Sequence, residues 1–449
     1  MRPDLAAKYD LRVPRYTSYP TAPHFSAAVG PDRYGQWLSE LQPTVPLSLY
    51  LHIAYCAEMC WFCGCHTKIT RQYAPVADYM DCLWREIDMV SDRLPQRMKA
   101  SHVHFGGGSP TILTPDDFVA TIDRLRRRFT IAEDAEIAVE LDPRTADEDY
   151  VAAMARSGVT RASIGVQDFN PVVQKAINRI QPYEVTSQVI AWLRRYGVAE
   201  INMDLVYGLP HQTAESLTET IDLAVGFAPR RIALFGYAHV PWMKKHQRLI
   251  PEAALPDVPE RWRQYDTAAA RLVEHGYVQV GLDHFARADD EMAQALAENR
   301  LHRNFQGYTT DEASVLLGFG ASGIGSLPQG YVANEGAIHT YKQVVRAGRL
   351  ATTRGVAVSA EDVLRRAIIE RLMCDLSLDL DAVCARFNAD PAQFDAELDS
   401  LAGMETDGLL VRRGRTVTIT EEGRPLVRAA CAAFDRYLRA GEARHSKAV

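Results

Sequence analysis

The sequence has little that would direct the chain to a membrane or to nucleic acid. None of its apolar runs approaches the roughly 18 residues that a membrane span needs. The first residues, MRPDLAAKYDLR, carry charges where a signal peptide needs an apolar stretch. Lys and Arg (50) are fewer than Asp and Glu (57), giving a net charge of −7, whereas nucleic-acid binders normally show a basic face. We therefore expect a cytoplasmic protein with neither partner.

Cysteine is also scarce, with 8 in 449 residues, and its distribution is uneven. Four cysteines fall within ten residues, at Cys56, Cys60, Cys63 and Cys65, and the other four are scattered (Cys82, Cys374, Cys384 and Cys431). In a reducing compartment such a cluster favours a metal site over disulfide bonds. The 47% hydrophobic and 24% charged residues are typical of a globular protein with a large core.

Short β-branched runs alternate with amphipathic helical stretches from about residue 47 to residue 240. The expected strands cover residues 47–53, 102–105, 136–141, 161–167, 200–207 and 231–240. Between the second and third, Thr114 and Pro115 mark a helix start, and Phe118, Ile122 and Leu125 follow at helical spacing. Six such alternations predict an α/β fold of parallel βαβ units. A partial (βα)6 TIM-like barrel is the favoured closure, and a doubly wound open sheet is the alternative.

The alternation weakens after residue 240. We expect a helix around residues 259–276 and a single strand over 277–286. From about Ser359 the pattern changes to helices, a hairpin over 409–420 with Arg413-Gly414 as its turn, and a final helix. The predicted organisation is an N-terminal arm (1–45), the partial barrel with its extension (46–355), and a mostly helical, winged-helix-like C-terminal domain (356–449) with a packing role.

The cysteine cluster, CAEMCWFCGC, directly follows the first expected strand. A structural zinc site usually needs two separated ligand pairs, and only His52 and His66 flank the cluster, so zinc is a weaker alternative. A packing role alone is weaker still beside a polar turn. Thiolates are the usual ligands of iron–sulfur clusters. A CxxxCxxC loop can bind three irons of a cubane and leave the fourth iron open to a substrate or cofactor.

This loop resembles the signature of the radical S-adenosylmethionine (SAM) superfamily. The resemblance implies that Cys56, Cys60 and Cys63 hold a [4Fe-4S] cluster and that the amino and carboxylate groups of SAM occupy the open iron. Phe62 supplies the aromatic residue that is typical before the third cysteine. Cys65 is then an additional thiol near the cluster. Packing is one interpretation of its role, and ligation during cluster assembly is the other.

Polar residues or glycines also follow the other expected strands, and active sites of parallel barrels lie at the carboxyl ends of their strands. The second strand runs into Gly106-Gly107-Gly108, and the later strands end at Glu140 and Asp142, at Gln167 and Asp168, at Asp204, and at Tyr237, Ala238 and His239. Each residue alone could be a cap or part of an ion pair. Polar groups at every strand end on one rim predict a functional site there.

Further segments extend the resemblance over nearly the whole chain, namely VPRYTSYPTA, GGGSPT, VELDPR, GVQDFN, DLVYGLP, FGYAHVP, GLDHFA and HRNFQGYTT. With the cysteine loop they resemble the oxygen-independent coproporphyrinogen III oxidases, the anaerobic enzymes of haem synthesis. This implies that Tyr50, Gly107 and Glu140 hold the SAM on the cluster. A second SAM would be lined by Phe62, Gly108, Ser109, Gln167, Arg179, Asp204, Ala238 and Ile324. Ser109 replaces a threonine that is common in the family and keeps its hydroxyl.

The resemblance also implies a reaction. Two propionates of coproporphyrinogen III are oxidatively decarboxylated to vinyl groups, giving protoporphyrinogen IX, by 5′-deoxyadenosyl radicals formed from SAM. A low-potential donor such as a flavodoxin or ferredoxin would supply the electron, and a monomer suffices. The substrate carries four carboxylates on an apolar macrocycle, so its pocket should combine cations and aromatic rings. The candidates are Arg15, Tyr16 and Tyr19 in the arm, which we expect to close over the substrate, and Arg303, Asn304, Phe305, Gln306, Lys244 and Lys245.

Three alternatives compete with the oxidase. They are a haem-trafficking chaperone descended from the same family, a radical SAM enzyme that acts on haem, and a zinc-stabilised binding protein. The chaperone-type relatives lack the RYTSYP arm and the CxC extension, and this chain has both, at residues 15–20 and 63–65. The oxidase is therefore favoured.

Single replacement of each cluster cysteine tests the ligand assignment. After anaerobic reconstitution with iron and sulfide, Cys56→Ser, Cys60→Ser and Cys63→Ser should each abolish the cluster, because each removes one thiolate ligand. Cys65→Ser is the matched control and should retain iron. Complete loss of iron from Cys65→Ser would make Cys65 a ligand.

Overall fold

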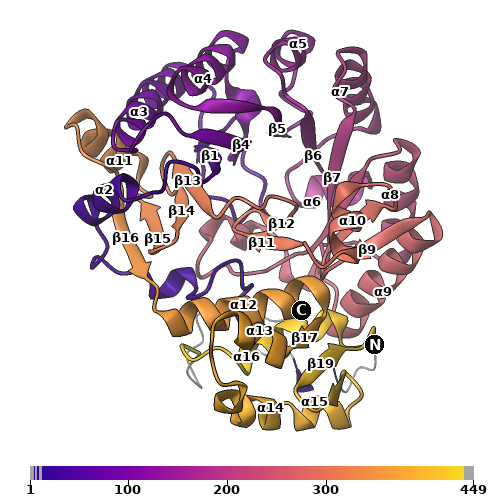
Figure 1. Ribbon diagram of the computed structural model, residues 1–449. Helices are drawn as coiled ribbons and strands as arrows, with labels where there is room; N and C mark the ends of the chain where they lie inside the picture. Colours follow the sequence, from indigo (N-terminus) through magenta and orange to yellow (C-terminus); the bar gives the residue numbers. More distant parts are fainter. Residues whose placement is uncertain (1–4, 6–7, 10–12, 439–449) are drawn as a thin grey trace.

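A twelve-stranded sheet forms the centre of the computed structural model, which describes residues 5, 8–9 and 13–438 (Figure 1). Six of its strands pair in parallel and in chain order. They are β1 (Leu47–Ile53), β4 (Lys99–Gly107), β5 (Thr130–Leu141), β6 (Arg161–Gln167), β7 (Glu200–Tyr207) and β8 (Arg231–Gly236). The predicted α/β alternation of six strands is confirmed, with the sixth strand ending four residues earlier than expected.

Helices cross over on the outer side of this curved sheet (Figure 1). They are α3 (Ala74–Ser91), α4 (Pro115–Arg128), α5 (Glu148–Arg156), α7 (Tyr183–Arg195) and α8 (Ala214–Gly226), with α9 (Val258–Glu274) following β8. The short helix α6 (Pro171–Ala176) lies inside this ring of helices (Figure 1). At the start of α4 the Thr114 hydroxyl accepts a hydrogen bond from the Asp117 N–H (3.2 Å), as its sequence predicts. Phe118, Ile122 and Leu125 are buried, so the apolar stripe of α4 faces the sheet.

Additional strands extend both edges of the parallel sheet. Beside β1 lie β13 (Val315–Phe319), β14 (Ile324–Leu327), β15 (Gly330–Asn334) and β16 (Thr352–Ala357), and beside β8 lie β10 (His284–Arg287) and β9 (Tyr277–Val280). The outermost strands, β16 and β9, do not pair with each other, so the barrel is partial. The prediction of one strand over 277–286 is wrong, because Gly281 adopts a φ of +58° and turns the chain into a hairpin.

The C-terminal part packs helices around a small sheet below the barrel (Figure 1). Its elements are α12 (Ala360–Asp375), α13 (Leu380–Arg386), α14 (Asp395–Ser400), α15 (Ala402–Thr406) and α16 (Val427–Ala432), with strands β17 (Ser377–Asp379), β18 (Leu410–Arg413) and β19 (Thr416–Ile419). The predicted hairpin is present, and Gly414 has a φ of +63° at its turn. The unpredicted β17 pairs with β19 as a third strand.

The remaining elements connect these layers. They are α2 (Pro31–Ser39), β2 (Tyr55–Cys56), β3 (Lys68–Ile69), α10 (Glu291–Ala297), β11 (His302–Asn304), β12 (Gly307–Thr309) and α11 (Ile338–Arg346).

Among the residues described, no helix combines the length and apolarity required to cross a membrane.

A buried carboxyl group ties the added strands to the barrel. Glu86 of α3 accepts hydrogen bonds from the Gly320 N–H (2.7 Å), the Asn334 side-chain amide (2.6 Å) and the Tyr341 hydroxyl (2.7 Å). Burial raises the pKa of Glu86 to about 7. These donors come from the end of β13, from β15 and from α11, so one side chain fixes three elements against α3.

The N-terminal arm packs against the last described residues. The Tyr16 hydroxyl donates to Asp435 Oδ2 (3.1 Å), and the Arg436 N–H donates to the Tyr19 hydroxyl (3.0 Å). Arg428 Nη1 donates to the Val13 carbonyl (3.4 Å). Buried residues of the arm, the barrel and the C-terminal part belong to one continuous core. The arm is therefore fixed by the C-terminal part.

Candidate active site

The cysteine loop leaves the carboxyl end of β1 and is held from two sides. The Trp61 N–H donates to the Ile177 carbonyl (2.9 Å), just after α6. On the other side the segment after β8 reaches the loop, because Gln247 Nε2 donates to the Phe62 carbonyl (3.0 Å) and Lys244 Nζ donates to the Cys65 carbonyl (3.0 Å). His246 also hydrogen-bonds the Cys63 carbonyl (2.8 Å). The loop is thus fixed at the rim of the barrel.

Each of the three proposed ligand sulfurs accepts hydrogen bonds. Thr67 Oγ1 donates to Cys56 Sγ (3.3 Å), and the Cys65 N–H donates to Cys63 Sγ (3.3 Å). Arg144 Nη2 lies 3.3 Å from Cys60 Sγ. The hydrogen bond from the Cys65 side chain lowers the pKa of Cys63, whereas burial raises the pKa of Cys56 to about 12. Donors aimed at the sulfurs suit thiolates that bind iron.

The chemistry of the three thiols fits a four-iron cubane. Each thiolate of a four-iron cubane binds a different iron atom, so its ligands do not converge on one point. The donor set of one loop, with three thiols and hydrogen-bond donors around them, therefore fits the [4Fe-4S] group.

An ion cluster connects Cys60 to two other strands. Asp142, just after β5, accepts from Arg144 Nη2 (2.7 Å) and from Arg179 Nη1 (3.3 Å). Burial opposes ionisation, but Arg179 and Arg144 lower the pKa of Asp142 to about 2. Arg179 also donates to Cys60 Sγ (3.5 Å) and to the Gly165 carbonyl of β6 (2.6 Å). The two arginines place positive charge beside a proposed thiolate ligand.

The glycine loop after β4 packs against the point where β1 ends. Gly107 has a φ of +111°, and a Cβ there would lie 2.7 Å from the His52 ring. A Cβ on Gly108 would lie 2.5 Å from the Tyr55 carbonyl oxygen. The Gly107 N–H donates to Glu140 Oε2 (3.3 Å). The absence of side chains thus lets this loop approach both β1 and Glu140, two places where the sequence predicts SAM contacts.

The other predicted SAM residues lie on or beyond neighbouring strands. Tyr50 is on β1, Glu140 on β5, Gln167 at the end of β6, Asp204 on β7 and Ala238 just after β8, while Ile324 begins β14. Burial and the Glu140 charge raise the pKa of Asp204 to about 7. Asp168, in contrast, accepts from Gln212 Nε2 (2.6 Å) and Thr220 Oγ1 (3.0 Å) and serves packing. The SAM-binding roles themselves stay predictions.

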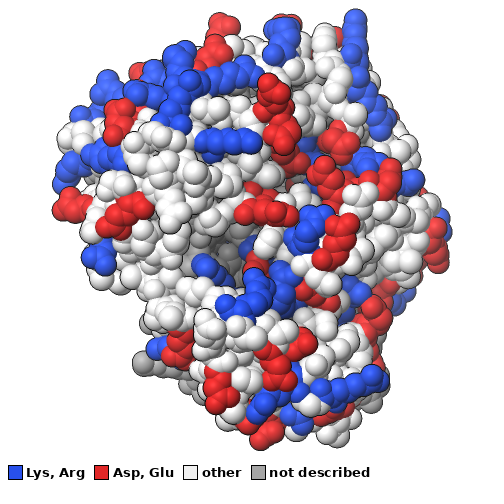
Figure 2. Space-filling model, viewed as in Figure 1, with Lys and Arg blue, Asp and Glu red and all other residues white. Residues whose placement is uncertain are grey.

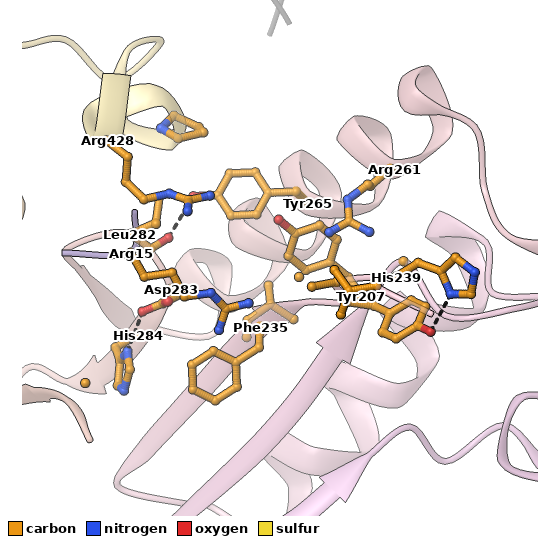
Figure 3. A pocket seen from close by; sticks show the side chains of 18 of the residues that line it. Arg15, Tyr207, Phe235, His239, Arg261, Tyr265, Leu282, Asp283, His284 and Arg428 are labelled. Carbon is orange, nitrogen blue, oxygen red and sulfur yellow. Dashed lines mark hydrogen bonds and ion pairs between the residues drawn. The ribbon is translucent and has the colours of Figure 1, made fainter. Parts of the chain in front are cut away.

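A cavity of about 620 Å³ opens beside this rim, within the size range of small-molecule sites. Figure 2 shows the surface hollowed near the junction of barrel and C-terminal part, with Lys and Arg at its margin. Four arginines from distant segments line the cavity, namely Arg15, Arg261, Arg303 and Arg428. Aromatic side chains form much of the remaining wall, including Tyr237 and Phe305. Figure 3 shows three more of them, Tyr207, Phe235 and Tyr265.

The arginines are positioned by stacking and by burial. The Arg303 guanidinium lies 4.4 Å from the Tyr308 ring centroid, and that of Arg261 lies 5.1 Å from the Tyr207 centroid. Burial and the charges of Arg15 and Arg303 lower the pKa of Arg428 to about 10. Arg303 Nε and Nη1 and Arg261 Nε are buried without a hydrogen-bond partner among the described residues. Buried donors normally find acceptors, so the cavity is suited to an anionic ligand.

The structure brings together part of the predicted substrate set. Arg15, Arg303, Phe305 and Gln306 line the cavity. Asn304 Oδ1 accepts from the Gln306 N–H (2.9 Å) and shapes the same turn.

The other predicted substrate residues do not line this cavity. Tyr16 and Tyr19 are buried, and their hydroxyls bond to Asp435 and to the Arg436 N–H instead. Lys244 reaches the cysteine loop, and Lys245 is exposed.

Sequence reasoning missed Arg261, Arg428 and Asp283 as cavity residues. Arg261 lies in an ordinary amphipathic helix, and Arg428 lies far along the chain from the other cavity residues. Only Asp283 lay within a segment, GLDHFA, that carried the family resemblance.

Comparisons with known proteins agree with this geometry. The Radical SAM superfamily profile matches residues 50–224, and the HemN C-terminal domain profile matches residues 358–426. The chain is 52% identical to the oxygen-independent coproporphyrinogen III oxidase of Bradyrhizobium diazoefficiens over 100% of both chains. The chain belongs to the oxygen-independent coproporphyrinogen III oxidase family.

Further members of this family match nearly as completely. The enzyme of that name from Cereibacter sphaeroides is 45% identical over 98% of this chain and 97% of its own. A solved structure of the Escherichia coli coproporphyrinogen III oxidase, described as a radical SAM enzyme, superposes with a TM-score of 0.90 at 37% identity, over 95% of this chain and 100% of that one. The radical SAM type of partial barrel is therefore confirmed, as is the family resemblance seen in the sequence.

The positive φ and the close packing of Gly107 provide a test of the glycine loop. Gly107→Ala should lower the free energy of unfolding by about 2 kcal/mol and weaken SAM binding, because the new methyl group collides with His52 and disfavours the positive φ. Urea unfolding and equilibrium SAM binding measure the two effects. Gly64→Ala is the matched control, since a Cβ at Gly64 in the cysteine loop meets nothing within 4 Å. Equal behaviour of the two variants would contradict this interpretation.

Proposed function

We propose that this protein oxidatively decarboxylates two propionates of coproporphyrinogen III to vinyl groups and so produces protoporphyrinogen IX. Its family membership supports this oxidoreductase activity in haem biosynthesis. The observation that carries the assignment to this chain's own site is the cavity with four arginines beside the cysteine loop. Gln247 connects the two places, because its Nε2 donates both to the Phe62 carbonyl and to the Ala238 carbonyl of the cavity wall (3.2 Å).

Cys56, Cys60 and Cys63 are the proposed ligands of the [4Fe-4S] cluster, with Tyr50, Gly107 and Glu140 holding SAM. When bound, the cluster and SAM supply a 5′-deoxyadenosyl radical, a reagent able to remove the non-acidic β-hydrogen of a propionate. Phe62, Gly108, Ser109, Gln167, Arg179, Asp204, Ala238 and Ile324 are proposed to line a second SAM. We further propose a low-potential electron-donor protein, a cytoplasmic location and a monomeric state.

The cavity residues bind and orient the macrocycle. Coproporphyrinogen III carries four carboxylates, and four arginines line the cavity, so each propionate could pair with a guanidinium. The aromatic wall would pack against the apolar macrocycle and exclude water from it. The positive charges of Arg15, Arg303 and Arg428 repel one another. A bound polyanion would reduce this repulsion, and this gain would favour binding.

The N-terminal arm supplies Arg15 to this cavity. We propose that the arm closes one side of the substrate site and that Tyr16 and Tyr19 act indirectly, by anchoring the arm to residues 435–436. We propose the same domain limits as before. Residues 46–355 would form the barrel and its extension, and residues 1–45 and 356–449 would complete the substrate pocket. In this arrangement the barrel performs the radical chemistry, while both ends of the described chain complete the substrate pocket.

Anaerobic reconstitution tests the activity directly. The protein is loaded with iron and sulfide and given SAM, a low-potential reductant and coproporphyrinogen III. We expect both 5′-deoxyadenosine and protoporphyrinogen IX to form, and chromatography with porphyrin fluorescence after oxidation quantifies them. Haem binding without either product would instead identify a haem-carrying relative.

The arginine assignment predicts a defect in substrate binding. Arg261→Ala should raise the KM for coproporphyrinogen III about tenfold or more, since a hydrogen bond to a charged group is worth about 1.5–3 kcal/mol. The absorbance of the cluster and SAM binding should stay unchanged. Arg263→Ala is the matched control on the same helix, because Arg263 is exposed and pairs with Glu215. A KM for Arg261→Ala within twofold of the Arg263→Ala value would remove Arg261 from the substrate site.

A further inference from the structure

A single carboxylate accompanies the four arginines of the cavity. Among the described residues that line it, Asp283 is the only acidic one. Figure 3 shows its side chain between Arg15 and His284, at the floor formed by the β9–β10 turn. A pocket that only gathered carboxylates would gain nothing from a negative charge of its own, so this residue requires an explanation.

The backbone that carries Asp283 is rigidly held. The Leu282 N–H donates to the Tyr308 hydroxyl (3.0 Å), and the Tyr265 hydroxyl donates to the Leu282 carbonyl (3.1 Å). The Leu234 N–H of β8 donates to the Asp283 carbonyl (2.8 Å). The turn at Gly281 is packed so closely that a Cβ there would lie 2.1 Å from the Tyr308 ring. Asp283 is thus presented to the cavity from a fixed position.

The carboxylate itself has one close partner. Asp283 Oδ1 lies 2.7 Å from His284 Nδ1, and the His284 ring packs edge-on against Phe235 and Tyr308. No ion pair within 4.0 Å joins Asp283 to a cavity arginine in the described structure. Burial opposes its ionisation, but His284, Arg303 and Arg15 lower the pKa of Asp283 to about 2. Asp283 is therefore an ionised hydrogen-bond acceptor. The charges of Arg303 and Arg15 stabilise its ionised form, but neither side chain forms an ion pair with it.

The substrate class of the proposed function offers donors that match. A porphyrinogen is fully reduced, so all four of its pyrrole nitrogens carry hydrogen and its ring can pucker to turn several N–H groups to one side. An oxidised porphyrin carries only two N–H groups, and its other two nitrogens present lone pairs. A carboxylate oxygen accepts hydrogen bonds but donates none when ionised. It would therefore attract the centre of the first macrocycle and repel the unprotonated nitrogens of the second.

We propose that Asp283 accepts hydrogen bonds from the pyrrole N–H groups, so that it centres the macrocycle among the four arginines and selects its reduced form. This proposal rests on the proposed function. The arginines would recognise the rim carboxylates, which the reduced and oxidised macrocycles share. Asp283 would recognise the pyrrole nitrogens, where the reduced and oxidised macrocycles differ in their number of N–H donors. Asp283 then contributes to discrimination between the two oxidation states through their N–H groups.

Binding measurements without turnover test this role. Coproporphyrinogen III and coproporphyrin III are dialysed anaerobically against the reconstituted protein in the absence of SAM, and each is quantified by porphyrin fluorescence after oxidation. We expect the unaltered protein to bind the reduced macrocycle at least about tenfold more tightly. Asp283→Asn should weaken binding of the reduced macrocycle about tenfold or more and leave binding of the oxidised one unchanged or stronger.

Asp289→Asn is the matched control. It removes the same charge from an exposed aspartate that pairs with Arg230, outside the cavity, and should retain the unaltered preference. If Asp283 serves only to balance the arginine charges, Asp283→Asn will change the affinity for both macrocycles equally, and the proposal is overturned. A lack of preference in the unaltered protein would overturn it as well, and this comparison does not depend on how the variant folds. Product formation in the reconstitution assay together with either result would leave the proposed function standing.

Discussion

Parallel pairing of six consecutive strands decides where the functional side chains of this protein can lie. Each crossover helix returns the chain to the same edge, so all six carboxyl ends meet at one rim. The cysteine loop, the glycine loop, Asp142 and Asp204 come from four different strands of this set and are still neighbours. Contacts such as those of Arg179 with Cys60 and with Gly165 are possible only because the strand order is fixed.

The electrostatics of the rim divides into two regions. Around Cys60, Arg144 and Arg179 both donate hydrogen bonds to Asp142. In the cavity, four arginines face one carboxylate, Asp283, which pairs with His284 and has no ion pair with these arginines in the described structure. The first arrangement holds the cysteine loop in place. The second has an excess of positive charge, which a polyanionic molecule would offset.

The sequence predicts the parallel strands well, because apolar β-branched runs bounded by turn residues identify buried strands locally. The ranges 47–53, 161–167 and 200–207 match β1, β6 and β7. The prediction of one strand over 277–286 fails because Gly281 adopts a positive φ, and the Tyr308 ring that packs against it belongs to β12, further along the chain.

The same distinction applies to the residues of the site. Some can be recognised from neighbouring residues in the sequence, and others only from contacts between distant segments. The cysteine motif is local and could be recognised from spacing alone, whereas Arg261 and Arg428 reach the cavity only through the packing of α9 and the C-terminal part. Tyr16 and Tyr19 looked like substrate contacts from composition, but their direction is set by residues 435–436.

The attachment of the arm has a consequence for biosynthesis of the protein. Tyr16 contacts Asp435 across a separation of 419 residues, so this contact of the arm can form only when almost the whole chain has been synthesised. The rim residues from β1 to β8 emerge from the ribosome much earlier and can form the cysteine loop without that anchor. Arg15, which the arm brings to the cavity, therefore reaches its final position later than the rim on which the cysteine loop lies.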